Sequence, residues 1–109
     1  MRVDFTKSFD KQFQKLPRKK QEQARDAISL FLDNALHPAL RNHALKGEWR
    51  DYRSIRAGGD LRLHYKLIND NAVLFVAVGT HSQLYKWYVA QGANTWYLIA
   101  DNWYLIPDT

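Results

Sequence analysis

Two histidines and a group of arginines lie near the predicted ends of strands, where side chains can meet at one edge of a sheet. His43 precedes one predicted strand, and His81 follows another in the stretch VAVGTHSQLYK. Histidine titrates near neutral pH and transfers protons, whereas arginine stays charged and holds phosphate oxygens. Taken alone, His81 is equally well explained as a turn residue that hydrogen-bonds to backbone. The other polar residues near these strand ends are Arg53, Arg56, Asp60, Arg62 and Tyr85.

Other kinds of site are not favoured by the sequence. The four histidines do not show the helical His-x-x-x-His spacing, and the chain has no cysteine for a thiolate site. It also has no phosphate-binding glycine loop and no Gly-x-Ser-x-Gly elbow. We therefore expect neither a metal nor a cofactor.

Hydrophobic spacing predicts an α+β domain that positions these residues. RVDF at residues 2–5 has the character of a strand, and Ser8 is predicted to cap a short first helix. Pro17 suits the start of a second helix, PRKKQEQARDAISLFLDN. Three strands in an antiparallel meander then follow, and the two helices form a hairpin that covers one face of the sheet.

The third predicted strand, DLRLHYKLI, alternates cleanly between apolar and polar residues. Successive strand residues point to opposite faces of a sheet, so Leu61 and Leu63 are expected in the core. Arg62 and His64 are expected on the opposite, polar face. The next strand, VLFVAV, is apolar throughout and is predicted to be central in the sheet.

Composition limits the classes of partner and location. The chain has 109 residues, 46% of them hydrophobic, which fits one folded domain. Its net charge is +5, and all 16 lysines and arginines lie between Arg2 and Lys86. This charge favours nucleic acid or an acidic protein as partner, although solubility alone explains it equally well. The sequence offers no membrane-spanning or signal segment and no cysteine, so we expect a cytoplasmic protein.

With these residues in place, HALKGEWRDYRSIRAGGDLRLHYKL followed by VGTHSQLYK resembles the RelE/ParE superfamily of bacterial toxins, and within it the YafQ-like branch. The resemblance covers residues 1–86. It implies the toxin of a type II toxin-antitoxin system with a RelE-like fold, a metal-independent endoribonuclease that cuts mRNA in the ribosome and is inhibited by a cognate antitoxin. The positions that match the branch's catalytic residues are His43, Asp60, His81 and Tyr85, and Arg53 matches a recurrent arginine.

Under this hypothesis the 2′-hydroxyl of the RNA attacks the adjacent phosphate, so the protein only moves protons and stabilises charge. His81 is predicted to be the general acid, and either His43 or Asp60 the base. Tyr85 would position a base of the RNA. The residues predicted to bind substrate are Arg53, Arg56, Arg62 and Lys46.

Two positions depart from the branch pattern. Arg56 stands where the pattern has a second histidine, and Leu61 stands where it has a tryptophan. Arginine binds phosphate well but is a poor proton carrier, so the set of proton-transferring groups is reduced. These departures keep open the alternative of a non-catalytic RelE/ParE relative that acts by binding, for example as a gyrase inhibitor.

Residues 87–109 are predicted to be a C-terminal extension outside the toxin domain. They contain the near copies TWYLIAD and NWYLIPD and no basic residue. An added hairpin, an extended flap, an interface, a fusion scar and a degradation signal all remain open as explanations.

Overall fold

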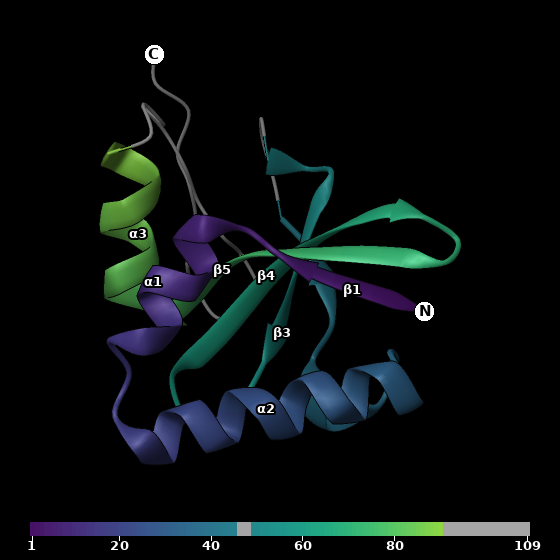
Figure 1. The fold of residues 1–109 in the computed structure, drawn as a ribbon, viewed down its shortest axis with the longest axis horizontal. Coiled ribbons are helices and arrows are strands. Elements are labelled where there is room, and N and C mark those ends of the chain that lie inside the picture. Colours follow the sequence, from purple (N-terminus) through teal and green to yellow (C-terminus); the bar gives the residue numbers. More distant parts are fainter. Residues whose placement is uncertain (46–48, 91–109) are drawn as a thin grey trace.

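The computed structural model describes residues 1–45 and 49–90, which form a five-stranded sheet covered by helices (Figure 1). In chain order the elements are β1 (Arg2–Phe5), α1 (Lys7–Gln14), α2 (Arg18–Asp33), a 3-10 turn (Pro38–Leu40), β2 (His43–Ala44), β3 (Tyr52–Arg56), β4 (Leu61–Asn69), β5 (Ala72–Thr80) and α3 (His81–Ala90). The predicted α+β class, the N-terminal strand, the two-helix hairpin and the meander are therefore confirmed.

The strands lie in the order β1-β5-β4-β3-β2. Strands β3, β4 and β5 form the predicted antiparallel meander, and β1 joins the far edge of the sheet parallel to β5. The two-residue strand β2 adds an antiparallel edge that pairs His43 with Ser54. This pairing brings His43 into the same sheet as the strands that carry the other candidate residues.

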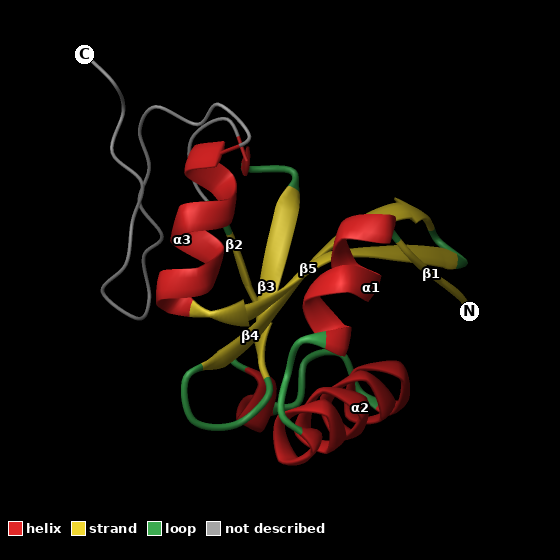
Figure 2. Cartoon of the chain, turned by 60° about the vertical axis from the view of Figure 1, so that its left-hand side comes forward, coloured by secondary structure: helices red, strands yellow, loops and turns green. Residues whose placement is uncertain are grey.

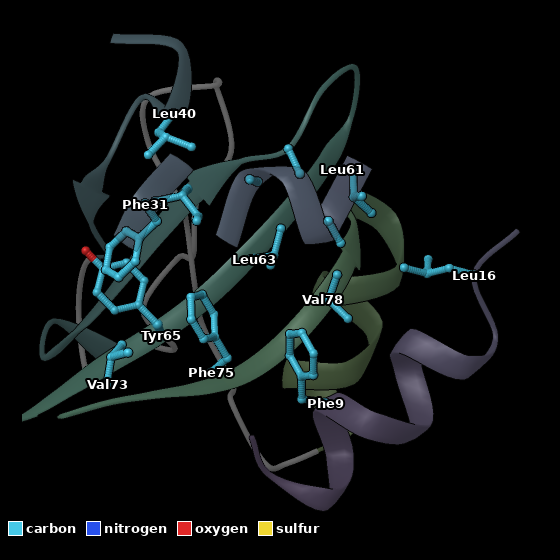
Figure 3. Packing of buried hydrophobic residues seen from close by; sticks show 14 residues of the cluster. Phe9, Leu16, Phe31, Leu40, Leu61, Leu63, Tyr65, Val73, Phe75 and Val78 are labelled. Carbon is cyan, nitrogen blue, oxygen red and sulfur yellow. The ribbon is translucent and has the colours of Figure 1, made fainter. Parts of the chain in front are cut away.

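Helices α1 and α2 pack on one face of the sheet and enclose the main core (Figure 3). Phe9 from α1 and Phe31 from α2 both contact the ring of Phe75 on β5. Helix α1 begins differently from the prediction, because Thr6 rather than Ser8 is the N-cap and its hydroxyl accepts a hydrogen bond from the Phe9 amide. Thr6 also donates to the Val76 carbonyl, which joins the start of α1 to the middle of β5.

Helix α3 covers the opposite face of the sheet, as Figure 2 shows. Its buried residues Leu84 and Tyr88 belong to a second cluster with Leu45, Val76 and Ala77. The helix ends at Ala90, so the predicted extension at residues 87–109 begins inside it. Residues 91–109, which contain the two near copies, lie outside the described residues, and their role stays a prediction.

The polar face of β4 is buried at two of its residues. Arg62 is 4% exposed and His64 only 1%. The strand alternates as expected, but α3 and its cluster cover the face on which these two residues lie. Polar character in a strand reports which residues share a face, and it does not show whether a later element covers that face.

A β-bulge in β5 sets which of its residues face α3. Tyr65 pairs with Phe75 and His64 pairs with Ala77, so Val76 is an extra residue between them. After this insertion Val78 faces the main core, whereas Ala77 faces α3. Bulges re-aim the residues that follow them. Here the following residues lead directly into His81.

Candidate active site at the start of helix α3

His81 and Asp60 are in direct contact. Nδ1 of His81, the first residue of α3, lies 3.0 Å from Oδ1 of Asp60, in the turn before β4. A carboxylate only accepts hydrogen bonds, so Nδ1 carries the proton of this contact. The carboxylate also stabilises the protonated imidazolium against the positive end of the α3 dipole. The pair is therefore suited to hold a proton that Nε2 of His81 can donate.

A reciprocal cap holds His81 at the start of α3. The Thr80 hydroxyl accepts from the Gln83 amide at 3.3 Å, and the Gln83 side chain accepts from the Thr80 amide at 2.9 Å. This arrangement is a capping box. Its sequence signature, Thr-His-Ser-Gln at residues 80–83, predicts a helix starting at His81, a signal that the strand-based interpretation missed.

His43 is held in one tautomer by the backbone. Its Nδ1 lies 2.7 Å from the carbonyl oxygen of Arg41, and a carbonyl only accepts, so Nδ1 carries the hydrogen of the neutral ring. Arg41 adopts the left-handed conformation (φ 47°, ψ 47°) after the 3-10 turn. Nε2 of His43 is then unprotonated, and it is buried without a hydrogen-bond partner among the described residues. An unprotonated, unengaged nitrogen can accept a proton, and a substrate hydroxyl reaches it at this buried position only after a local rearrangement.

His64 is a third histidine in this region and was not among the predicted site residues. Nδ1 of its ring lies 2.7 Å from the hydroxyl of Tyr88 on α3. Burial, together with the charges of His43, His81 and Arg62, lowers the pKa of His64 to about 3. These charges place His64 within electrostatic reach of both predicted proton-transfer histidines. The sequence pattern of β4 placed His64 only on the polar face, because nothing in that strand shows that α3 covers it.

The two arginines on this face have different surroundings. Arg56 pairs with Arg62 across β3 and β4 and is half-buried at the end of its strand. The Arg62 guanidinium is buried and donates to the carbonyls of Gly59 and Leu61. It therefore holds the turn that carries Asp60. Gly58 and Gly59 complete this turn with positive φ angles of 105° and 51°, which glycine adopts at little cost.

Not all of the remaining predicted site residues lie near His81 and Asp60. Tyr85 lies one helical turn beyond His81 and is 46% exposed. Arg53 belongs to the other face of the sheet, where its Nε donates to Asn42, which is also hydrogen-bonded to Tyr65. Lys46 lies outside the described residues. The structure thus groups His43, Asp60, Arg56, Arg62, His81 and Tyr85, and it separates Arg53 from them.

Within residues 1–45 and 49–90, no three histidine or acidic side chains are grouped so that they could hold a metal ion. In the same residues, no helix has the length and apolar character needed to cross a membrane. The arrangement offers a charge-stabilised acid, a base with a fixed tautomer and a nearby arginine. These groups can carry out proton transfer at a phosphate ester.

Comparison with known proteins agrees with this arrangement. The family model described as the bacterial toxin of type II toxin-antitoxin systems, YafQ, matches residues 1–86. The chain belongs to the YafQ toxin family. The resemblance predicted from the sequence is thereby confirmed, and the match covers the whole group of candidate site residues. No curated protein matches the chain by sequence.

Solved structures of related toxins share the fold of this YafQ-family chain. The crystal structure of YafQ from E. coli strain BL21(DE3) is 26% identical, with a TM-score of 0.65 over 78% of this chain and 99% of that one. The E. coli DinJ-YafQ complex gives 27% identity and a TM-score of 0.64 over 78% and 99% of the two chains. The RelB-RelE complex from Methanococcus jannaschii, at 23% identity, has a TM-score of 0.63 over 79% and 99% and supports the fold alone.

Proposed function

We propose that this YafQ-family toxin is a metal-independent endoribonuclease that cuts mRNA on the ribosome. The observation that carries the proposal is the contact between His81 and Asp60, because it equips a histidine at the rim of the sheet to donate a proton. Membership of a toxin family and the basic charge of the chain agree with an RNA substrate.

In the proposed reaction the RNA supplies its own nucleophile. Nε2 of His43 removes the proton of the 2′-hydroxyl, whose oxygen attacks the adjacent phosphorus. The bond from phosphorus to the 5′-oxygen breaks, and Nε2 of His81 protonates that oxygen. The products are a 2′,3′-cyclic phosphate and a 5′-hydroxyl, and no water or metal enters this step.

The geometry favours His43 over Asp60 as the base. The Asp60 carboxylate is already engaged by Nδ1 of His81, so its role is to stabilise the protonated acid. His43 has its hydrogen on Nδ1 and its lone pair on Nε2. His43 can therefore accept a proton at Nε2 while His81 supplies one from its own Nε2.

Attack by the 2′-oxygen forms a negatively charged phosphorane, in which phosphorus has five oxygen ligands. A cation that can reach this group is needed to stabilise its charge. We assign this role to Arg56, which lies at the end of β3 beside Arg62. Arg62 supports the site indirectly, because its hydrogen bonds to backbone carbonyls hold the turn that carries Asp60. The ring of Tyr85 is exposed one turn from His81 and is placed to stack on a base of the RNA. Substrate contacts by Lys46 and Arg53 stay predictions, and the position of Arg53 on the other face does not support its contact.

The proposed partners are the ribosome, mRNA and a cognate antitoxin. The titles of the related structures describe DinJ bound to YafQ and RelB bound to RelE. By analogy, an acidic antitoxin segment would bind the basic surface of this toxin and exclude RNA from it. A toxin that acts on ribosomes must work in the cytoplasm, which is the location we propose.

Expression in a bacterial host tests the function. Induction of the wild-type chain is expected to arrest growth and to produce mRNA cuts that primer extension maps at in-frame positions. His81→Ala should abolish both effects while the protein stays folded and still binds its antitoxin, because only the proton donor is lost. Exposed Lys7→Ala is the matched surface control and should behave as wild type.

Other outcomes have definite meanings. Growth arrest without mRNA cuts would overturn the nuclease and favour a binding toxin, such as a gyrase inhibitor. Cuts that leave a 3′-hydroxyl instead of a 2′,3′-cyclic phosphate would overturn the 2′-hydroxyl mechanism. Cuts that persist in His81→Ala would remove His81 from the role of acid.

A further inference from the structure

A buried hydrogen bond joins helix α3 to the middle of the sheet. The Tyr88 hydroxyl lies 2.7 Å from Nδ1 of His64, and the two rings are stacked with their centroids 5.5 Å apart. Both side chains are almost fully buried. A fixed polar contact between two buried rings is specific in direction, which apolar packing is not.

The charge states of the two groups in this bond follow from burial. Burial raises the pKa of the Tyr88 hydroxyl, with a further rise from Tyr52, and burial lowers that of His64 to about 3. Both groups are therefore neutral at physiological pH. Within this bond either the phenol donates to Nδ1 of His64 or a protonated Nδ1 donates to the phenol oxygen, and in both cases the contact joins two neutral groups.

Tyr88 and His81 lie on the same side of α3. They are seven residues apart, which is close to two full turns at 3.6 residues per turn. Tyr88 contacts His64 within β4, and His81 contacts Asp60 just before β4. The two ends of the helix are thus attached to the same strand by two polar contacts on one face.

Apolar contacts hold α3 on the sheet through a few side chains, among them Tyr88, whose ring meets Trp49 edge-on. The buried residues of α3 are Leu84 and Tyr88, and its exposed side includes Tyr85 and Val89. Leu84 tolerates small rotations of the helix because dispersion contacts have no preferred direction. The hydrogen bond between Tyr88 and His64 does not tolerate such rotations, since a hydrogen bond weakens steeply when its angle changes.

We propose that Tyr88 and His64 are positioning residues that fix the rotation of helix α3 and thereby hold the ring of His81 on the Asp60 carboxylate. This inference rests on the proposed function only for its effect on cleavage. Its geometric part, the orientation and protonation of His81, stands without any activity.

The first test measures His81 directly by histidine NMR in the full chain. Tyr88→Phe removes only the hydroxyl and should weaken the contact with Asp60, so that the His81 pKa falls toward its value in Asp60→Asn. The matched control is Tyr65→Phe, which removes a buried hydroxyl bound to Asn42 on the other face of the sheet and should leave the His81 titration unchanged.

The surroundings of His81 are the same in the wild type, Tyr88→Phe and Tyr65→Phe, except for the hydroxyl removed. The charged and titratable groups of the candidate site around His81 are Asp60, Arg62 and His64, with His43 from β2 and Arg56 from β3, and α3 itself adds Tyr85, Lys86 and Tyr88. A difference between the two phenylalanine variants therefore reports the hydroxyl of Tyr88 and its bond to His64.

The second test uses the partner residue and its rescue. His64→Leu removes the hydrogen-bond partner of Tyr88 and should lower the His81 pKa as Tyr88→Phe does. His64→Asn places an amide group near the position of Nδ1, where it can accept from or donate to the Tyr88 hydroxyl, and should restore most of the wild-type titration. If either replacement of His64 fails to fold, Tyr88→Phe and Tyr65→Phe still decide the question.

Cleavage of mRNA on programmed ribosomes then tests the catalytic consequence. Tyr88→Phe should lower kcat by about tenfold with little change in KM, because substrate binding is not touched. In a His81→Ala background the same substitution should cause no further loss, since it acts through His81.

An unchanged His81 titration in Tyr88→Phe would overturn the inference, as would losses in cleavage that multiply in the double variant. A shifted titration together with cleavage that does not depend on His81 would leave the positioning pair in place and refute the proposed function instead. The two failures are therefore distinguishable.

Discussion

Acid is expected to destabilise this toxin through one buried side chain, His64. Burial and the nearby charges hold the pKa of its imidazole at about 3, below the ordinary value of 6.5. Between these values the unfolded chain binds a proton at His64 and the folded chain does not, so falling pH favours unfolding. The free energy of unfolding falls by about 1.4 kcal/mol per pH unit in this window. From about pH 7 to about pH 4.5, His64 alone accounts for a loss of about 2.5 kcal/mol.

Urea unfolding at a series of pH values measures this loss. Because single domains are stable by only about 5–15 kcal/mol, a change of this size is readily resolved. The wild type and His64→Leu should differ in the slope of stability against pH, since all other titrating groups are shared. His37→Gln, at a partly exposed ring that accepts from the Ala39 amide, is the matched control and should keep the wild-type slope. Equal slopes for the wild type and His64→Leu would refute the assignment of His64 as a buried neutral group.

Three further substitutions test the site and its supports. Asp60→Asn removes the charge that stabilises protonated His81, so the rate of cleavage should fall roughly tenfold. The alkaline limb of the pH–rate profile should also move to lower pH, and an unshifted limb would contradict the pairing of His81 with Asp60. Gly58→Ala forces a side chain into φ 105° and toward Gln23, so thermal unfolding should show a loss of about 1–2 kcal/mol, and an unchanged melting temperature would contradict that strain. Thr6→Ala removes the cap of α1 and the bond to Val76, and chemical unfolding should show a loss of about 1 kcal/mol, whereas a neutral effect would show that neither bond matters.

Much of the fold was predictable because its patterns are local. The alternation of β4 correctly placed Leu61 and Leu63 in the core, and Pro17 correctly marked the entry to α2. The N-cap was assigned two residues late, because Thr6 and Ser8 both have the required hydroxyl and only the backbone decides between them.

The site was predictable as a set of residue types and less so as an arrangement. Family resemblance selected His43, Asp60 and His81, which the structure places on one side of the sheet. It also selected Arg53, which the alternation of β3 sends to the other side. His64 was not predicted as a site residue because the sequence pattern around a histidine in an alternating strand is the same whether its face is exposed to solvent or buried.

The sequence by itself determined the α+β class, the main core and the histidines and aspartate that suit proton transfer, because strand and helix periodicities and side-chain chemistry are properties of neighbouring residues. Only the tertiary structure decided which face of the sheet the site occupies. The bulge at Val76 sets which residues of β5 point to each face of the sheet. An unbroken apolar run does not show by itself which of its residues face which side. The burial of His64 beneath Tyr88 depends on α3 folding back over the sheet. Its neutral charge and depressed pKa follow from desolvation, which no local sequence pattern encodes.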